Sequence, residues 1–365
     1  MHTPQPIYSS EHRDFLFKLL TQPSPSGWEA GGTAIWRQEA QKFADRVEQD
    51  PHGNTWATLT GRSDDAPVVM LEAHADEIGF IVKHVSEDGF VSISPVGGSD
   101  KTIAAARRIQ IFTKKGVVPG VIGNTAIHLR NTDKDKLPDW KDLFVDIGVR
   151  SAEEAAELGI QVGCPAVYVD GTVEMGSNRL VGRALDNRVG GFLLVRILEL
   201  LSTGERPKAT VVAANAVQEE LGSYGASMIA HRIAPDAAIV FDVTHATDTP
   251  GIDAREHGNI KLGAGPTVAH GMSNHPLIVE KLETLAEQDN LPLQHEAISR
   301  TTRTDNDAVF ASQEGIPSAL ISFPLRYMHS PTETIDLNDL ETAAKLVASF
   351  IRSLQPGEKF EPKGV

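Results

Sequence analysis

The residues in this sequence best suited to chemistry are imidazoles and carboxylates that directly follow apolar runs. Such runs are typical of buried strands, and ligands in α/β sheets bind outside the carboxyl ends of the strands. Side chains at these ends can therefore meet even when they are far apart in the sequence. The runs at 68–71, 209–217, 237–241 and 318–323 lead into His74, Asp76, Glu219, Glu220, Asp242 and His329.

Asp186 is a further candidate, and its position has two interpretations. It lies where a loop enters the apolar segment 189–201. An aspartate at that position can cap a helix and stabilise it by about 1 kcal/mol. It can also bind a metal ion, because the four strand ends supply acidic and imidazole groups with no comparable basic group to pair with them.

Two histidines and three carboxylates gathered in one crevice would carry excess negative charge. Uncompensated buried charge is strongly unfavourable, and a pair of divalent cations would neutralise it. Imidazole nitrogen and carboxylate oxygen suit zinc, cobalt or manganese, and one carboxylate can bridge two ions about 3.5–4 Å apart. The sequence therefore predicts a site for two divalent metal ions.

The adjacent residues Glu219 and Glu220 are expected to have different roles. Neighbouring side chains on an extended segment point apart, so both should not bind one ion. One would bind metal, and the other would be free to take a proton from water whose pKa the ions lower towards about 7. The two residues could instead form a solvated acidic pair. His245, three residues beyond Asp242, is a candidate for contact with the substrate or with the metal ligands.

The elements that must position these residues alternate between helices and strands after residue 181. This alternation predicts an α/β fold with a mixed, largely parallel sheet sandwiched by helices. Two further helices are expected near 15–20 and 34–43, before a hairpin turn at 52–54. The later elements are predicted as helices at 187–201, 225–233, 276–288 and 337–354 and strands at 209–217, 237–243 and 318–323.

Between residues 79 and 175 the pattern changes to short β-rich segments broken by Gly, Asp and Pro. Ser151 and Glu154 have the spacing of a capping box, which predicts one short helix that ends near Gly159. We therefore expect a catalytic domain of residues 1–78 and 176–365, interrupted by an inserted small β-rich domain of residues 79–175. The strand before the insert must belong to the same sheet as the later strands if His74 is to meet the other candidates.

Length, charge and composition limit the class of protein. A chain of 365 residues exceeds the roughly 250–300 residues over which a single core grows. The formal charge of −15 would repel phosphate backbones and anionic lipid heads, so neither nucleic acid nor a membrane is an expected partner. The longest apolar stretch contains Arg196 and Glu199 and falls short of the about 20 residues that span a bilayer. The first residues do not have the pattern of a secretion signal, which is a basic segment followed by an apolar one. The single cysteine, Cys164, cannot form an internal disulfide and is expected to be buried. The predicted location is the cytoplasm.

Taken together, the motifs resemble the tetrahedral dodecameric metallo-aminopeptidases, also called deblocking or glutamyl aminopeptidases, within the co-catalytic zinc peptidase clan. The order of the motifs and the β-rich insert after the first one are similar to that family too, so the resemblance covers nearly the whole chain. The motifs are Glu72-Ala73-His74-Ala75-Asp76-Glu77-Ile78-Gly79, Gly182-Arg183-Ala184-Leu185-Asp186-Asn187-Arg188, Gln218-Glu219-Glu220-Leu221-Gly222, Phe241-Asp242-Val243-Thr244 and Arg326-Tyr327-Met328-His329-Ser330-Pro331.

The resemblance implies two metal sites joined by a bridging carboxylate from Asp186. Zinc is the expected metal, with cobalt or manganese as alternatives. The remaining ligands are implied to be His74 and Asp242 in one site and Glu220 and His329 in the other.

The resemblance also implies which residues assist the reaction and how the protein assembles. Glu219 would be the general base, and Asp76 would orient the imidazole of His74. The β-rich insert would be a dimerisation domain, and dimers would build a hollow dodecamer.

The sequence departs from the family in one loop. Family members often carry Gly-Gly-Thr-Asp, whereas this sequence has Thr302-Arg303-Thr304-Asp305. If the loop borders the substrate pocket, the guanidinium of Arg303 could favour substrates with acidic side chains, or it could merely occupy space.

The reaction implied by the resemblance is hydrolysis of the N-terminal peptide bond of peptide substrates. An N-acyl amino acid deacylase or a carboxypeptidase would use the same metal pair on a different substrate. A non-catalytic, metal-stabilised assembly that binds peptides is an alternative of another class. A closed structural metal site, however, needs no free base such as the second glutamate.

Overall fold

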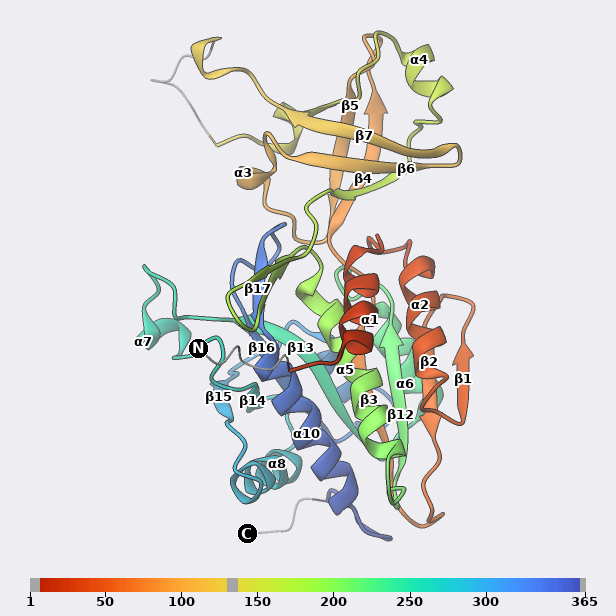
Figure 1. Cartoon of the computed structure of the whole chain (residues 1–365), viewed down its shortest axis with the longest axis vertical. Coiled ribbons are helices and arrows are strands. Elements are labelled where there is room, and N and C mark those ends of the chain that lie inside the picture. Colours follow the sequence, from red (N-terminus) through yellow and green to blue (C-terminus); the bar gives the residue numbers. More distant parts are fainter. Residues whose placement is uncertain (1–6, 130–136, 362–365) are drawn as a thin grey trace.

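The computed structural model describes residues 7–129 and 137–361. Figure 1 shows a small β barrel above a larger sheet that is covered by helices. The chain passes from the larger sheet into the barrel directly after β3 and returns before β10.

The larger sheet has eight strands in the order β1-β2-β12-β3-β13-β16-β14-β15. The four central strands β12, β3, β13 and β16 are parallel to one another, whereas β1, β2 and β14 are joined to their inner neighbours by antiparallel pairing. In the order of the sheet, the bounds are β1 Arg46–Gln49, β2 Thr55–Leu59, β12 Thr210–Ala216, β3 Val68–His74, β13 Ala237–His245, β16 Ser318–Leu325, β14 Thr267–His270 and β15 Gln294–Ala297.

Helices cover both faces of this sheet because alternate residues of the buried central strands are apolar on each side. Leu71 and Phe241 lie in the larger core, which includes residues of α1, α2, α5, α8 and α10, whereas Met70 and Val240 pack with α6 and α9. The helices are α1 Ser10–Thr21, α2 Ala30–Ala40, α5 Leu185–Ser202, α6 Tyr224–Ile233, α7 Ala254–His257, α8 Pro276–Gln288, α9 Asp305–Phe310 and α10 Leu337–Ser353.

The inserted barrel is closed in the strand order β4-β5-β8-β7-β6-β9 and has its own core. Phe80 and Ile111 are fully buried in that core. The elements of the insert are β4 Gly79–Val85, β5 Val91–Val96, α3 Lys101–Ala104, β6 Arg108–Thr113, β7 Gly116–Gly123, the 3-10 turns Ile127–Leu129 and Trp140–Asp142, β8 Phe144–Asp146, α4 Ala152–Glu157 and β9 Pro165–Tyr168.

A third, three-stranded sheet lies outside the barrel. It consists of β10 (Val173–Met175), β11 (Arg179–Gly182) and β17 (Glu333–Asp336), all paired antiparallel. This sheet joins the segment that leaves the barrel to the segment that enters α10.

The predicted fold class is confirmed: a mixed, largely parallel sheet lies between helices and carries an inserted β-rich unit. The predicted helix of the insert begins where expected, because the Ser151 hydroxyl accepts a hydrogen bond from the backbone N–H of Glu154. The insert also contains α3, which was not predicted because four residues are too few for a helical period. None of the helices within the described residues has the length and apolar character needed to cross a membrane.

Candidate metal centre

Four parallel strands bring the candidate ligands to one edge of the sheet. Ala216 at the end of β12 is paired with His74 at the end of β3, and β13 and β16 are the next two strands. Asp242 lies in β13, and His329 follows β16. Parallel neighbours have their carboxyl ends at the same edge of a sheet, so residues from distant parts of the chain meet there.

The first group of possible metal ligands consists of His74, Asp186 and Asp242, all buried. Nε2 of His74 lies 3.2 Å from Oδ1 of Asp186 and 3.9 Å from Oδ1 of Asp242. Bonds of about 2.0–2.1 Å in a tetrahedral zinc site place ligand atoms about 3.3 Å apart. The His74–Asp186 separation matches that spacing, and the wider Asp242 contact needs only a small adjustment.

The second group consists of Asp186, Glu220 and His329. Nε2 of His329 lies 3.3 Å from Oδ2 of Asp186 and 3.5 Å from Oε1 of Glu220. The two groups therefore share Asp186 but use different oxygens of its carboxylate. That sharing is the arrangement of a carboxylate that bridges two ions.

Asp186 is available for this role because it does not cap α5. The N-cap residue of α5 is Ala184, whose backbone is left-handed and whose side chain makes no capping hydrogen bond. Asp186 and Asn187 have non-helical backbone angles, which turn the Asp186 side chain towards the strand ends. The Asn187 side chain fixes this turn by donating a 2.7 Å hydrogen bond to the carbonyl of Phe241. The capping interpretation of Asp186 is therefore wrong.

The electrostatics of the cluster fit bound cations. Burial raises the pKa of Asp242 well above its ordinary value and that of Glu219 to about 10, and the carboxylates around each add to the rise. Burial opposes ionisation of Asp186 too, but hydrogen bonds from His329 and His74 lower its pKa. In turn, Asp186 and Glu220 outweigh burial and raise the pKa of His329 to about 11. Protons thus compensate an excess of carboxylates here, and divalent cations can take their place.

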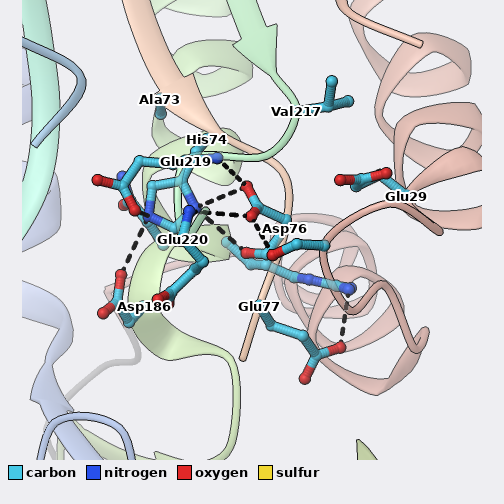
Figure 2. A network of polar contacts seen from close by, with 12 residues as sticks. Glu29, Ala73, His74, Asp76, Glu77, Asp186, Val217, Glu219 and Glu220 are labelled. Atoms are coloured by element: carbon cyan, nitrogen blue, oxygen red, sulfur yellow. Dashed lines mark hydrogen bonds and ion pairs between the residues drawn. The ribbon is translucent and has the colours of Figure 1, made fainter. Parts of the chain in front are cut away.

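Asp76 holds several parts of the site together from behind His74. Nδ1 of His74 lies 3.3 Å from Oδ1 of Asp76, and the Ser26 hydroxyl donates to Oδ2 at 2.5 Å. The backbone N–H groups of Glu219 and Glu220 also donate to the Asp76 carboxylate, at 3.0 and 3.2 Å. Figure 2 shows Asp76 to one side of His74, Glu219 and Glu220. One carboxylate therefore fixes both the imidazole and the turn that carries the two glutamates.

Glu219 and Glu220 do point to different partners, but not for the reason predicted. They lie in a turn after β12, where Gln218 has a left-handed backbone, and not on an extended segment. Oε2 of Glu219 lies 3.9 Å from Nε2 of His74, whereas Glu220 faces His329. The Asp76 carboxylate holds the N–H groups of both residues in this turn, and their side chains leave the turn towards different histidines.

A cavity of about 900 Å³ opens over the centre. Asp186, Glu219, Glu220, Asp242 and His329 all line it, while His74 and Asp76 lie behind them. Arg303 and His245, which were predicted to contact the substrate, line the same cavity. Glu296, which was not predicted, lines it too.

Comparison with known proteins agrees with this geometry. The family model described as M42 glutamyl aminopeptidase matches residues 53–346. The chain belongs to the M42 family. It is 32% identical over 348 residues to the lysyl aminopeptidase of Pyrococcus furiosus, an alignment that covers 94% of this chain and 97% of that protein.

Solved structures of similar aminopeptidases have the same fold. Aminopeptidase APDkam598 of the archaeon Desulfurococcus kamchatkensis superimposes with a TM-score of 0.88 at 34% identity, over 95% of this chain and 96% of that one. The Pyrococcus horikoshii TET1 peptidase gives a TM-score of 0.83 at 30% identity, over 94% of this chain and 100% of that one. As a member of the M42 family with these relatives, the protein is a peptide hydrolase of the aminopeptidase type.

In this M42 family member, Glu333 is a buried residue of the centre that the sequence analysis did not identify. Its carboxylate accepts hydrogen bonds from the backbone N–H groups of Asp186, at 3.2 Å, and of His329, at 2.9 Å. It therefore joins the two loops that carry ligands of the second group. In the sequence, the one indication that Glu333 supports the centre is that it lies four residues after His329. That spacing alone does not distinguish Glu333 from an ordinary surface glutamate.

Glu77 anchors the loop beyond His74 through buried arginines. Its carboxylate pairs with Arg183 and, at 3.1 Å, with Arg188, both from the segment that carries Asp186. It also accepts a 2.8 Å hydrogen bond from the backbone N–H of Ser24. Glu77, Arg183 and Arg188 lie in the sequence motifs, but only the structure shows that they hold the loops of His74 and Asp186 together.

Proposed function

We propose that this protein hydrolyses the N-terminal peptide bond of peptides with two divalent metal ions, most readily zinc, held by His74, Asp186, Glu220, Asp242 and His329. The observation that carries the proposal is the position of Asp186, whose two carboxylate oxygens face two different histidines. Two donor groups that share one carboxylate are suited to a pair of ions, and imidazole with carboxylate favours zinc, cobalt or manganese. When bound, such ions lower the pKa of water and stabilise the negative charge that develops on the substrate carbonyl oxygen.

Glu219 is proposed to move the proton. Its carboxylate lines the cavity beside His74 but belongs to neither group of possible ligands. Its raised pKa in the site without cations arises from burial and from the carboxylates of Asp242 and Asp305, so added positive charge would lower it. Ionised Glu219 can then take a proton from the attacking water at Oε2 and pass it to the leaving amine.

Substitution of Glu219 by Gln tests this role. The amide keeps the shape of the side chain but cannot accept the proton, so kcat should fall by about 100-fold or more while the metal content stays unchanged. The measurement is hydrolysis of amino-acid amides together with elemental analysis, with the exposed residue Glu157→Gln as a matched control. A Glu219→Gln enzyme that keeps more than about a tenth of the wild-type rate would remove the general-base assignment.

The same assay separates the alternative reactions. An aminopeptidase needs a free α-amine on the residue that it removes, whereas a deacylase acts on the N-acylated form and a carboxypeptidase on the other end of the chain. Membership of the M42 family favours the aminopeptidase. Hydrolysis of free but not of N-acetylated amides is therefore expected, and the reverse pattern would favour deacylation. A protein that binds metal and peptide without any turnover would be the non-catalytic assembly.

We also propose that residues 79–175 form a dimerisation domain, apart from the catalytic residues 1–78 and 176–365, and that dimers build a dodecamer. Two observations support this assembly. The barrel has a closed core of its own, so its outer surface is free for contacts between chains. The similar Pyrococcus horikoshii peptidase is described as able to assemble into a tetrahedron or a large octahedral shell.

A further inference from the structure

A second cluster of histidines and carboxylate lies at the far edge of the large sheet, away from the candidate metal centre. His270 ends β14, His295 lies in the neighbouring strand β15, and Glu283 lies on α8. His295 is paired with Val268, and residues two apart on a strand face the same side, so both imidazoles point to one face of the sheet. Helix α8 lies by these two strands (Figure 1). The carboxylate of its residue Glu283 lies within 3.4 Å of both imidazoles.

The three donor atoms have the spacing of ligands around a single ion. Nε2 of His270 lies 3.0 Å from Nδ1 of His295, and Oε1 of Glu283 lies 3.4 Å and 3.3 Å from these two nitrogens. Three ligands of a tetrahedral zinc ion are about 3.3 Å apart when the bonds are about 2.0–2.1 Å long. The three atoms therefore form a nearly equilateral triangle that an ion can cap, with water as the fourth ligand.

The cluster does not belong to the candidate metal centre. Glu296, the residue after His295, points to the opposite face of β15, where it accepts a hydrogen bond from Thr244 and lines the cavity over the centre. His295 faces away from that cavity, and neither His270 nor Glu283 lines it. The two sites thus lie on opposite faces of one edge strand.

Cations can reach the cluster from solvent. The side chains of His270, Glu283 and His295 are 41%, 33% and 56% exposed. Two surface hollows of about 470 and 590 Å³ meet here, one lined by His270 and the other by His295. Glu280, one turn before Glu283 on the same face of α8, lines both hollows and adds negative charge beside the imidazoles.

We propose that His270, Glu283 and His295 bind one divalent transition-metal ion, separate from the catalytic pair. Two imidazoles and one carboxylate favour zinc, nickel or copper over magnesium or calcium, which prefer oxygen ligands. The ion ties α8 to the strands β14 and β15, which form the outer edge of the sheet. Since this ion binds only the folded arrangement of the three side chains, it stabilises the folded protein. It takes no part in the reaction, which uses the separate pair of ions.

The test compares the zinc content of the full-length enzyme with that of His295→Asn after equilibration at the same free zinc concentration. The variant should hold one zinc per chain fewer and keep aminopeptidase activity within about twofold, because no catalytic group is altered. Added zinc should raise the Tm of the wild type by about 2–4 °C more than that of the variant.

Two controls keep the result decisive. Glu283→Gln, on a different element, should also lose one zinc, so poor folding of a single variant does not decide the outcome. The exposed residue His52→Asn should keep the wild-type zinc content. Equal zinc contents in the wild type, His295→Asn and Glu283→Gln would overturn the proposal, as would an equal loss in His52→Asn.

Discussion

Each residue of the candidate centre obtains its role from what its side chain meets. Asp186 could cap a helix that began at residue 187, but the non-helical backbone of Asp186 and Asn187 turns its side chain towards two imidazoles. Asp76 contributes no ligand atom to either donor group, yet it holds His74 and the N–H groups of both glutamates. The ligands depend on such supporting contacts as much as on their own chemistry.

Arg303 is the residue whose effect on substrate choice can be measured most directly. It lines the cavity and has a left-handed backbone with φ of +57°, which glycine adopts without strain. Arg303→Gly should therefore fold normally. If the guanidinium pairs with acidic substrates, the ratio of kcat/KM for glutamyl over leucyl amides should fall roughly five- to tenfold, the effect of about 1 kcal/mol for a partly exposed ion pair.

The matched control for Arg303 is Arg300→Gly, an exposed position that does not line the cavity. Its glutamyl to leucyl ratio should equal that of the wild type. An unchanged ratio in Arg303→Gly itself would show that the arginine only occupies space. The acidic neighbours Glu296 and Asp307 line the same cavity, and they would then govern the choice between acidic and basic substrates.

At the scale of the elements, the sequence predicts those helices and strands that are encoded by long apolar segments. The central strands and the main helices were predictable because burial on both faces leaves continuous apolar segments. The edge strand β15, Gln294–Ala297, was missed because its residues are polar and half exposed. The contacts of Glu333 were not predicted, and of the contacts of Asp76 only the one with His74 was expected. Both residues act on loops, and turns such as that at Gln218 have no hydrophobic periodicity from which their contacts could be predicted.

The loop after β5 shows how the insert reaches the candidate centre. A Cβ atom on Gly98 would lie 2.4 Å from Nδ1 and 2.8 Å from Cε1 of His329, far inside contact distance. Gly98→Ala should therefore displace the imidazole, with a fall in activity of about tenfold or more and weaker metal retention.

Gly171→Ala, in the segment between β9 and β10, is the control for the substitution at Gly98. A Cβ there meets no atom within 4 Å, and the backbone of Gly171 is not left-handed, so both activity and metal content should match the wild type. Full activity in Gly98→Ala would mean that the loop moves aside freely and does not help to position His329.

At the scale of the whole molecule, the proposed assembly depends on the outer surface of the barrel. Val121 on β7 and Phe144 on β8 point outwards and are 45% and 36% exposed, and Phe90 packs edge-on against Phe144 with ring centroids 5.2 Å apart. Apolar residues grouped on a surface mark interaction sites. The double variant Val121→Glu and Phe144→Glu should shift the particle mass measured by light scattering towards that of single chains or smaller oligomers.

Ile252→Glu provides the comparison, because Ile252 is 37% exposed and lies before α7, outside residues 79–175. Its particle mass should equal that of the wild type. An unchanged mass in the double variant would place the contacts between chains on another surface. The barrel core of Phe80 and Ile111 is untouched in all three substitutions, so folding should be preserved.

The central claim is that Asp186 is shared by two metal ions, and anomalous X-ray diffraction at the zinc absorption edge tests it most directly. Crystals of the zinc-loaded enzyme should give two anomalous peaks on either side of the Asp186 carboxylate, about 3.5–4 Å apart. One peak should lie beside His74 and Asp242, and the other beside Glu220 and His329. A single peak there, or none in crystals of protein that hydrolyses amino-acid amides, would contradict the claim.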